Sequence, residues 1–203
     1  MKHLVTSGCS FSDIDNPETP WPVWLGKLFP NLDMYNLGCC AQGQDYISRS
    51  VIYQVNELLH KHDAKDIFVV VCWSGLQRRA LLVNKETTKM HYRFNDWNVG
   101  DSEQMRECKI GSWQDFDEEY QKIQCEEHNI IQSMEHIIRT QDFLKVRNVD
   151  FKFFGFNNLF ANLNEHNFLT KSRGVRIDKK YSNTSYLFNI MDWDKWWFHK
   201  KFG

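Results

Sequence analysis

One run of apolar residues restricts the fold of this chain more than any other feature of its sequence. Residues 67–73, with the sequence IFVVVCW, contain no charged side chain and follow the polar segment His62-Asp63-Ala64-Lys65-Asp66. A continuous apolar run of this length, bounded by polar residues, is typical of a strand that is buried on both faces in a parallel sheet. Parallel strands need long crossover connections, usually helices, so the run already favours an α/β fold.

The segments around this run agree with that fold. Apolar patterning predicts further strands at residues 3–6, 33–37 and 149–156, and helical spacing predicts helices at 21–29, 45–61 and 120–146. Strands and helices therefore alternate along the chain, which indicates a three-layer α/β/α sandwich with a mostly parallel sheet, of flavodoxin-like type. A length of 203 residues fits a single domain spanning 1–203.

Two segments lack a regular spacing of apolar residues that would indicate a helix or a strand. Residues 84–119 are polar with scattered aromatic side chains, and we interpret them as an irregular insertion that either covers the mouth of a site or makes a simple surface excursion. A small hairpin is expected around residues 88–98. The pattern is also weak over 157–203, where residues 192–202 are expected to form a short aromatic helix.

Composition excludes several classes of protein. The net charge is −1, so no overall field favours nucleic acid or an anionic membrane, and no stretch approaches the roughly 18 apolar residues of a membrane span. Six cysteines occur without a CxxC pair or zinc-type histidine spacing, so we expect no metal site and no cofactor. No leader pattern precedes the first strand, which favours a reduced, cytoplasmic protein. Aromatic residues make up 15% of the chain and serve either a ring-rich core or a ligand groove.

Three turns of the predicted sheet contain candidate catalytic groups. Ser10 follows the first strand and Gly8, Gly38 ends the second strand, and Ser74-Gly75 follows the third. The carboxyl ends of parallel strands share one edge of the sheet, where ligands bind, so these turns are expected to lie together. A serine nucleophile needs a base, and the oxyanion that it forms needs preorganised donors. The backbone N–H groups of Ser10 and Gly38 are candidate donors.

The motifs at these turns resemble those of a known family. Gly8-Cys9-Ser10-Phe11-Ser12 is similar to the first block of the SGNH (GDSL-type) hydrolases, and Asn36-Leu37-Gly38, followed by Gly43, is similar to the second. The resemblance implies that Ser10 is both nucleophile and oxyanion donor and that Gly38 is a second donor. It covers residues 1–80 well and 120–156 in outline. Among subfamilies, the chain most resembles bacteriophage-encoded members, which implies a host cytoplasm.

The chain departs from the family pattern at three places. Cys9 replaces the usual Asp of the first block. The third block normally offers an Asn donor, whereas here Ser74 or the Gly75 N–H would substitute, with Arg78 binding an anionic substrate or simply opening a solvated helix.

The closing Asp-x-x-His block has no match, and its nearest counterpart is Asp194 with His199, which have four residues between them rather than two. His166 and His136 are further candidates for the base, although His136 falls on the long helix and better fits surface or packing. The final helix that the family places after this block has no counterpart before Gly203.

Two main hypotheses follow. In one, the protein is a serine esterase or acyl hydrolase that acts on a small ester such as an acetylated carbohydrate, with His199 as base and Asp194 as its orienter. In the other, it is a degenerate or C-terminally truncated SGNH-like protein that binds a carbohydrate or protein partner without turnover. A nucleotide-binding domain is a weaker third interpretation, because the glycines near Gly8 match neither phosphate-loop nor dinucleotide spacing. Nothing in the sequence indicates an oligomeric state.

Overall fold

The computed structural model describes residues 1–15, 20–40, 42–76, 79–82, 97–100, 126–155, 159 and 182–197. In chain order, the elements are β1 (His3–Ser7), α1 (Trp21–Leu28), β2 (Asp33–Asn36), α2 (Gln44–Leu59), β3 (Ile67–Trp73), β4 (Arg79–Leu82), β5 (Trp97–Gly100), α5 (Glu126–Val146), β6 (Asp150–Gly155) and α6 (Ser182–Ile190). Short 3₁₀ turns lie at Ala64–Asp66 and Trp193–Lys195. The strands and helices expected in the first 76 residues are confirmed, as are the strand expected at 149–156 and, over 126–146, the long helix, whose expected first residues 120–125 lie outside the described residues.

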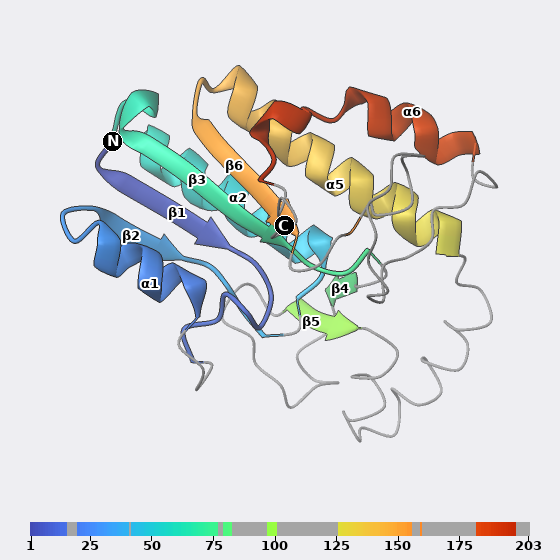
Figure 1. The fold of residues 1–203 in the computed structure, drawn as a ribbon, viewed down its shortest axis with the longest axis horizontal. Coiled ribbons are helices and arrows are strands. Elements are labelled where there is room, and N and C mark those ends of the chain that lie inside the picture. The colour runs from blue at the N-terminus through green and yellow to red at the C-terminus, as the bar shows by residue number, and fades with distance from the viewer. Residues whose placement is uncertain are drawn as a thin grey trace, which may run out of the picture.

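A four-stranded, all-parallel sheet with the order β2-β1-β3-β6 forms the centre of the fold. Figure 1 shows the arrowheads of β1, β3 and β6 pointing the same way, toward the side on which β4 and β5 lie. The apolar run occupies a central strand, with β1 on one side and β6 on the other. Six of its seven residues, Ile67 and 69–73, are at most 1% exposed, as expected for a strand covered on both faces. The α/β fold is thus the one that the sequence predicted.

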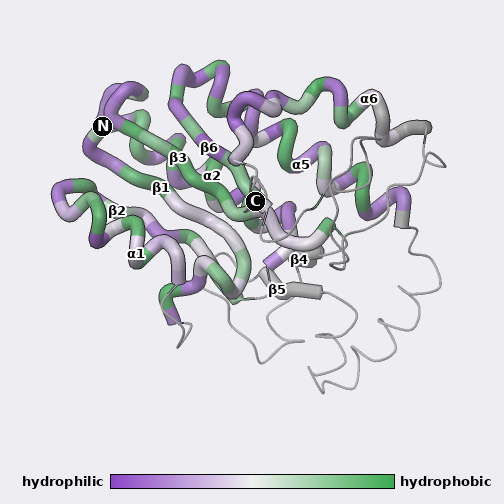
Figure 2. The backbone as a smooth tube through the Cα atoms, in the orientation of Figure 1, coloured by the Kyte–Doolittle hydropathy of each residue, from purple (hydrophilic) through white to green (hydrophobic). Residues whose placement is uncertain are grey.

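Helices α2 and α5 pack against each other and cover one face of the sheet. Val51 and Val55 of α2 and Met134 and Ile137 of α5 are fully buried in one core with the sheet. Figure 2 shows hydrophobic residues running along β3, and hydrophobic and hydrophilic residues alternating along α5. This alternation is the amphipathic pattern from which both helices were predicted.

Helix α1 lies against the opposite face. A Cβ at Gly26 of α1 would meet the sulfur of Met34 in β2, and the ring of Trp21 lies 5.1 Å from that of Phe154 in β6. Successive side chains of a strand point to opposite faces, so Phe154 faces away from its core neighbour Phe153. The three-layer sandwich stays a prediction, since one short helix covers little of this face in the described chain.

The C-terminal segment corrects one expectation. Residues 192–197 do not form the expected aromatic helix: a single 3₁₀ turn is followed by Trp196, which makes a parallel bridge to Phe153 of β6. The Trp197 N–H donates a 2.8 Å hydrogen bond to the Phe153 carbonyl. The physical reason is that the edge of β6 offers unpaired backbone groups, which an extended segment satisfies. The helix of this region is instead α6, upstream.

Strands β4 and β5 form a separate antiparallel pair, in which residues 79–82 are hydrogen-bonded to residues 97–100. The hairpin expected around 88–98 falls mostly outside the described residues, as does most of the proposed insertion at 84–119. The alternative in which Arg78 opens a solvated helix is wrong, because the next residue, Arg79, begins strand β4. In the part of the chain that the structure describes, no helix combines the length and apolar character needed to cross a membrane.

Candidate functional site

Ser10 lies in a tight double turn at the carboxyl end of β1. The Ser12 N–H donates to the Cys9 carbonyl over 2.8 Å, and the Asp13 N–H donates to the Ser10 carbonyl over 3.4 Å. Gly8 allows this reversal, because a Cβ there would meet the Ser12 hydroxyl and lie 2.9 Å from the Cys72 carbonyl. The chain therefore passes close to β3 at Gly8 and then carries Ser10 to the sheet edge.

The turn holds two serines in opposite environments. Ser12 is fully buried, and its hydroxyl oxygen accepts a 2.8 Å hydrogen bond from Trp21 Nε1. Ser10 is only partly buried. Among the serines whose side chains the structure describes, Ser10 is the one that is not buried.

The loop after β2 binds the Ser10 turn through its backbone. The Cys39 N–H donates to the Gly8 carbonyl, and the Cys40 N–H donates to a carboxylate oxygen of Asp13 over 2.6 Å. The other Asp13 oxygen accepts from the Asp15 N–H, and this carboxylate is 8% exposed. The two loops that follow β1 and β2 thus form one rigid edge of the sheet.

Gly38 lies in direct contact with the turn. A Cβ at this position would overlap the carbonyl group of Ser12, so no larger residue fits without moving the backbone. Its N–H donates a 3.0 Å hydrogen bond to Asn36 Oδ1. An oxyanion bound by the Gly38 N–H would have to share that N–H with Asn36 Oδ1 or displace Asn36 Oδ1 from it. The role of Gly38 as an oxyanion donor stays a prediction.

Ser74 lies at the same edge, after β3. Its N–H donates a 3.1 Å hydrogen bond to Gln44 Oε1, and its carbonyl accepts from Gln44 Nε2. Gln44 is the first residue of α2, so this two-point clamp fixes the loop after β3 to the start of a helix. The Ser74 side chain is fully buried, which leaves its hydroxyl with no exposed surface in this state.

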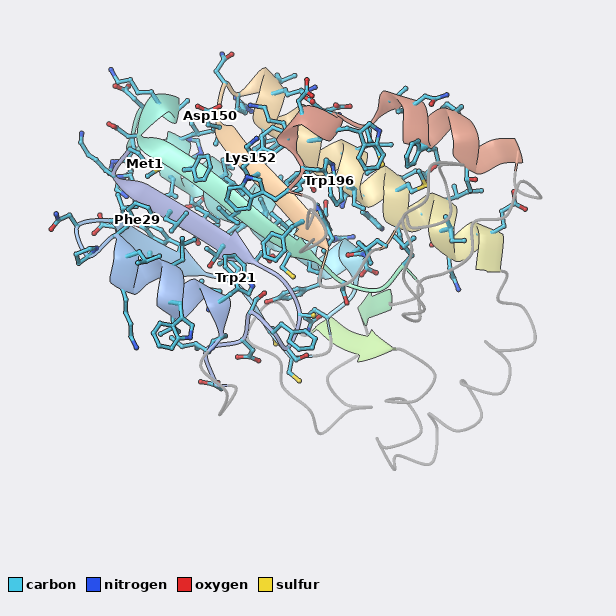
Figure 3. The ribbon with its side chains drawn as sticks, viewed as in Figure 1. Met1, Trp21, Phe29, Asp150, Lys152 and Trp196 are labelled. Carbon is cyan, nitrogen blue, oxygen red and sulfur yellow. The ribbon has the colours of Figure 1, made fainter. Side chains whose placement is uncertain are left out.

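A row of aromatic rings leads from the Ser10 turn toward the C-terminal segment. Trp21, which holds Ser12, lies 5.1 Å from Phe154, and Phe154 lies 6.4 Å from Trp197. Trp197 is 49% exposed. Figure 3 shows Trp21 near the end of β1, and Trp196 beside the strand that carries Asp150 and Lys152. Because the Phe153–Trp196 bridge is parallel, the chain at Trp197 runs toward the edge that carries Ser10.

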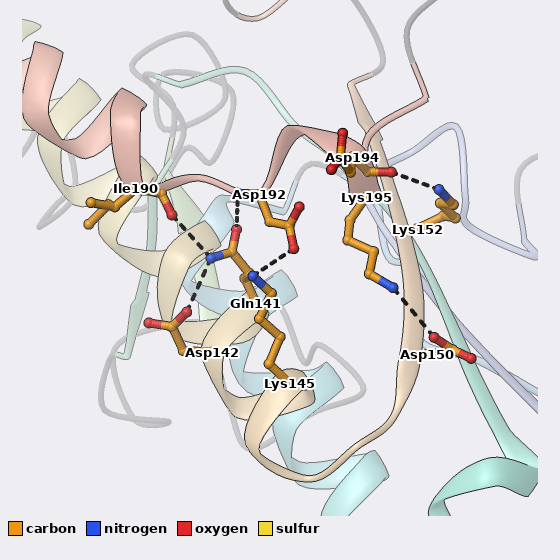
Figure 4. Close-up of polar contacts among 9 residues, drawn as sticks. All are labelled: Gln141, Asp142, Lys145, Asp150, Lys152, Ile190, Asp192, Asp194 and Lys195. Carbon is orange, nitrogen blue, oxygen red and sulfur yellow. Dashed lines mark hydrogen bonds and ion pairs between the residues drawn. The ribbon is translucent and has the colours of Figure 1, made fainter.

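The other candidate site residues do not lie with Ser10, Gly38 and Ser74 in the described structure. Asp194 has an exposed side chain, and its carbonyl accepts a 2.8 Å hydrogen bond from Lys152 Nζ, beside the middle of β6 rather than at its end (Figure 4). His136 is half-buried on α5, where its carbonyl accepts from Thr140. Arg78, His166 and His199 lie outside the described residues. The structure therefore gathers Ser10, Gly38 and Ser74 at one edge and leaves Asp194 further back along β6.

Sulfur groups lie beneath the site. Cys9, Cys39 and Cys72 are buried, and Cys40 is exposed. Burial raises the pKa of the Cys72 thiol well above its usual range, nearby Cys9 adds to the rise, and a hydrogen bond with Ser12 opposes it. Cys72 is thus a neutral packing group and not a nucleophile. Within the described ranges, no three His, Cys, Asp or Glu side chains converge as metal ligands.

Sequence reasoning missed the residues that hold the site together. Asn36 belongs to a recognised motif and Gln44 directly precedes the helix expected at 45–61, yet the contacts that their side chains make between the loops were not anticipated. The sequence feature that could have identified them is a carboxamide side chain at the end of a strand or at the start of a helix, where backbone N–H and C=O groups lack partners within the element. Comparison of the sequence with models of known families and with curated proteins gives no match.

Proposed function

We propose that this protein is a serine acyl hydrolase of the SGNH type that acts on a small ester, for which an acetylated carbohydrate is the leading substrate class. The observation that carries the proposal is the contrast between its two turn serines: Ser12 is buried and hydrogen-bonded, and Ser10 is partly exposed at the carboxyl edge of a parallel sheet. Ligands of open α/β sheets bind at this edge.

In the proposed reaction, Ser10 Oγ attacks the acyl carbon while His199 accepts the hydroxyl proton. The N–H groups of Ser10 and Gly38 receive the oxyanion, and of the two candidates after β3 the Gly75 N–H is the better third donor, because Ser74 is fully buried and its N–H donates to Gln44. The alcohol leaves with the proton from His199, and water then hydrolyses the acyl-enzyme by the same route. Asp194 orients His199, and Arg78 binds any anionic group of the substrate. The direction of the chain at Trp197, which points toward the edge that carries Ser10, supports His199 as the base, because His199 follows only two positions later in the sequence.

The experiment is covalent labelling with a fluorophosphonate probe, followed by mass mapping of the modified peptide. Wild type should be labelled on Ser10, and Ser10→Ala should lose the label. Ser50→Ala, which changes a buried serine of α2, should keep it. His199→Ala should slow labelling by roughly a hundredfold or more, as expected for loss of a general base, and His136→Ala should not. Equal labelling of wild type and Ser10→Ala would refute the proposal.

A second candidate is a non-catalytic binding protein with the same fold, and one observation favours it. The Gly38 N–H is engaged by Asn36 Oδ1, so one donor expected for the oxyanion already has an acceptor. This candidate predicts no labelling of Ser10. It also predicts saturable binding of an O-acetylated oligosaccharide in titration calorimetry, with an affinity that Ser10→Ala leaves unchanged.

A further inference from the structure

Asn36 makes three hydrogen bonds that join separate parts of the edge. Its Oδ1 accepts from Thr6 Oγ1 and from the Gly38 N–H, both over 3.0 Å. Its Nδ2 donates to the Ser12 carbonyl over 2.8 Å. One half-buried side chain at the end of β2 thus contacts the end of β1, the Gly38 loop and the Ser10 turn.

The chemistry of these partners defines the orientation of the amide. A backbone N–H can only donate and a backbone carbonyl can only accept, so Oδ1 must face Gly38 and Nδ2 must face Ser12. An aspartate here would keep the first contact and place an acceptor against the Ser12 carbonyl. A leucine would lose both. The side chain therefore needs a donor and an acceptor at once, which a carboxamide provides.

The contact to Ser12 bears directly on Ser10. The Ser12 N–H closes the first turn on the Cys9 carbonyl, and its carbonyl is held by Asn36, so the residue two positions after Ser10 is fixed from both sides. Gly38 is fixed by the same amide, against the same carbonyl group. Rotation of the Asn36 side chain would break both of these hydrogen bonds.

We infer that Asn36 is a positioning residue that fixes the Ser10 hydroxyl relative to the Gly38 N–H; the inference rests on the proposed function of Ser10 as nucleophile. Asn36 contacts the loops that carry both groups and takes no part in bond making. Loss of the amide should therefore slow the chemical step at Ser10 more than it weakens ligand binding, because misplacement by about 1 Å can cost roughly a hundredfold in rate.

The test compares Asn36→Leu with wild type and with Thr6→Val, which removes one donor to Oδ1 but leaves both loop contacts in place. Labelling by the fluorophosphonate is measured at several probe concentrations, to separate the limiting rate of phosphonylation from the probe concentration at half-saturation. Asn36→Leu should lower the limiting rate by about tenfold to a hundredfold with little change in half-saturation. Thr6→Val should change neither by more than about twofold. Asn36→Asp, which keeps the Gly38 contact, replaces Asn36→Leu if that variant does not fold.

Hydrogen exchange of the peptide that contains residues 9–13 is measured on the same proteins and needs no activity. Exchange should be faster in Asn36→Leu and unchanged in Thr6→Val. A wild-type limiting rate in folded Asn36→Leu overturns the inference. If wild type itself is not labelled, the proposed function fails, and exchange then decides the inference: faster exchange supports Asn36 as the residue that positions Ser10, and unchanged exchange overturns it.

Discussion

The indole Nε1 of Trp21 donates a 2.8 Å hydrogen bond to the hydroxyl oxygen of Ser12, which is fully buried. This bond connects the first residue of α1 to the turn that carries Ser10. The same indole lies edge-on to Phe154, with 77° between the ring planes. The face of the sheet opposite α2 is thus tied to the candidate site by one polar and one aromatic contact of a single side chain.

Trp21→Phe should destabilise the protein while keeping most of the aromatic contact. The substitution removes the indole N–H and leaves a buried Ser12 oxygen without this donor, at a cost of about 1–3 kcal/mol in the free energy of unfolding. Trp24→Phe is the matched control, because Trp24 lies on the same helix with 57% of its surface exposed and should cost far less. Urea unfolding followed by circular dichroism measures both, and equal losses would contradict the role of the bond.

Gly38→Ala should be much more damaging than Gly26→Ala. A Cβ at Gly38 meets the backbone carbonyl of Ser12, which cannot move without shifting the Ser10 turn, and overpacking of this kind costs about 1–3 kcal/mol or more. A Cβ at Gly26 meets the flexible end of Met34, and alanine also favours the helix. Melting temperatures of the two variants check the difference, and a Gly38→Ala protein as stable as wild type would show that the loops are less tightly packed than described.

Stability should fall as the solution is acidified, in part because of His3. This side chain is 4% exposed, and its pKa is lowered from the ordinary value of 6.5 mainly by burial, then by nearby His62, while Asp33 and Asp66 oppose the shift. The unfolded chain therefore binds a proton more readily than the folded protein. The contribution of His3 to stability is complete above pH 6.5 and is lost as the pH falls from that value through the lower pKa of His3 in the folded protein.

The measurement is the free energy of unfolding of wild type and His3→Leu between pH 5 and pH 8. The variant should show a weaker loss of stability on acidification. His60→Gln, which changes an exposed histidine, should retain the wild-type pH dependence. A His3→Leu protein with an unchanged pH profile would exclude His3 as the titrating group.

The C-terminal segment should depend on Gln141 more than on Lys145. Gln141 is 2% exposed; its Nε2 donates to the Ile190 carbonyl, and its Oε1 accepts from the Asp192 N–H over 2.6 Å (Figure 4). Gln141→Leu leaves these buried groups without partners and should cost about 1–3 kcal/mol. Lys145→Met removes a 2.6 Å ion pair with Asp192, but the lysine side chain is 44% exposed, so the cost should stay below about 1 kcal/mol. Guanidinium unfolding gives both values, and the reverse order would contradict the assignment.

The sequence was sufficient to predict the parallel sheet because its signals are local. Residues 67–73 are apolar without interruption, and only a strand covered on both faces suits them in this setting. The amphipathic spacing within 120–146 likewise predicts a helix, since burial of one face needs no knowledge of its partner. The position of Ser10 follows from the same logic, because a turn after a parallel strand lies at the ligand-binding edge.

The tertiary structure decided what surrounds these elements. The bridge between Trp196 and Phe153 joins residues more than 40 positions apart, and the edge of β6, not the aromatic pattern of 192–202, determines that the segment is extended. The difference between Ser10 and Ser12 is also invisible in the sequence, where the two serines lie two positions apart in the same turn. It arises because Trp21 and Asn36 reach Ser12 from distant elements, and such contacts depend on side chains meeting in space rather than on any local period.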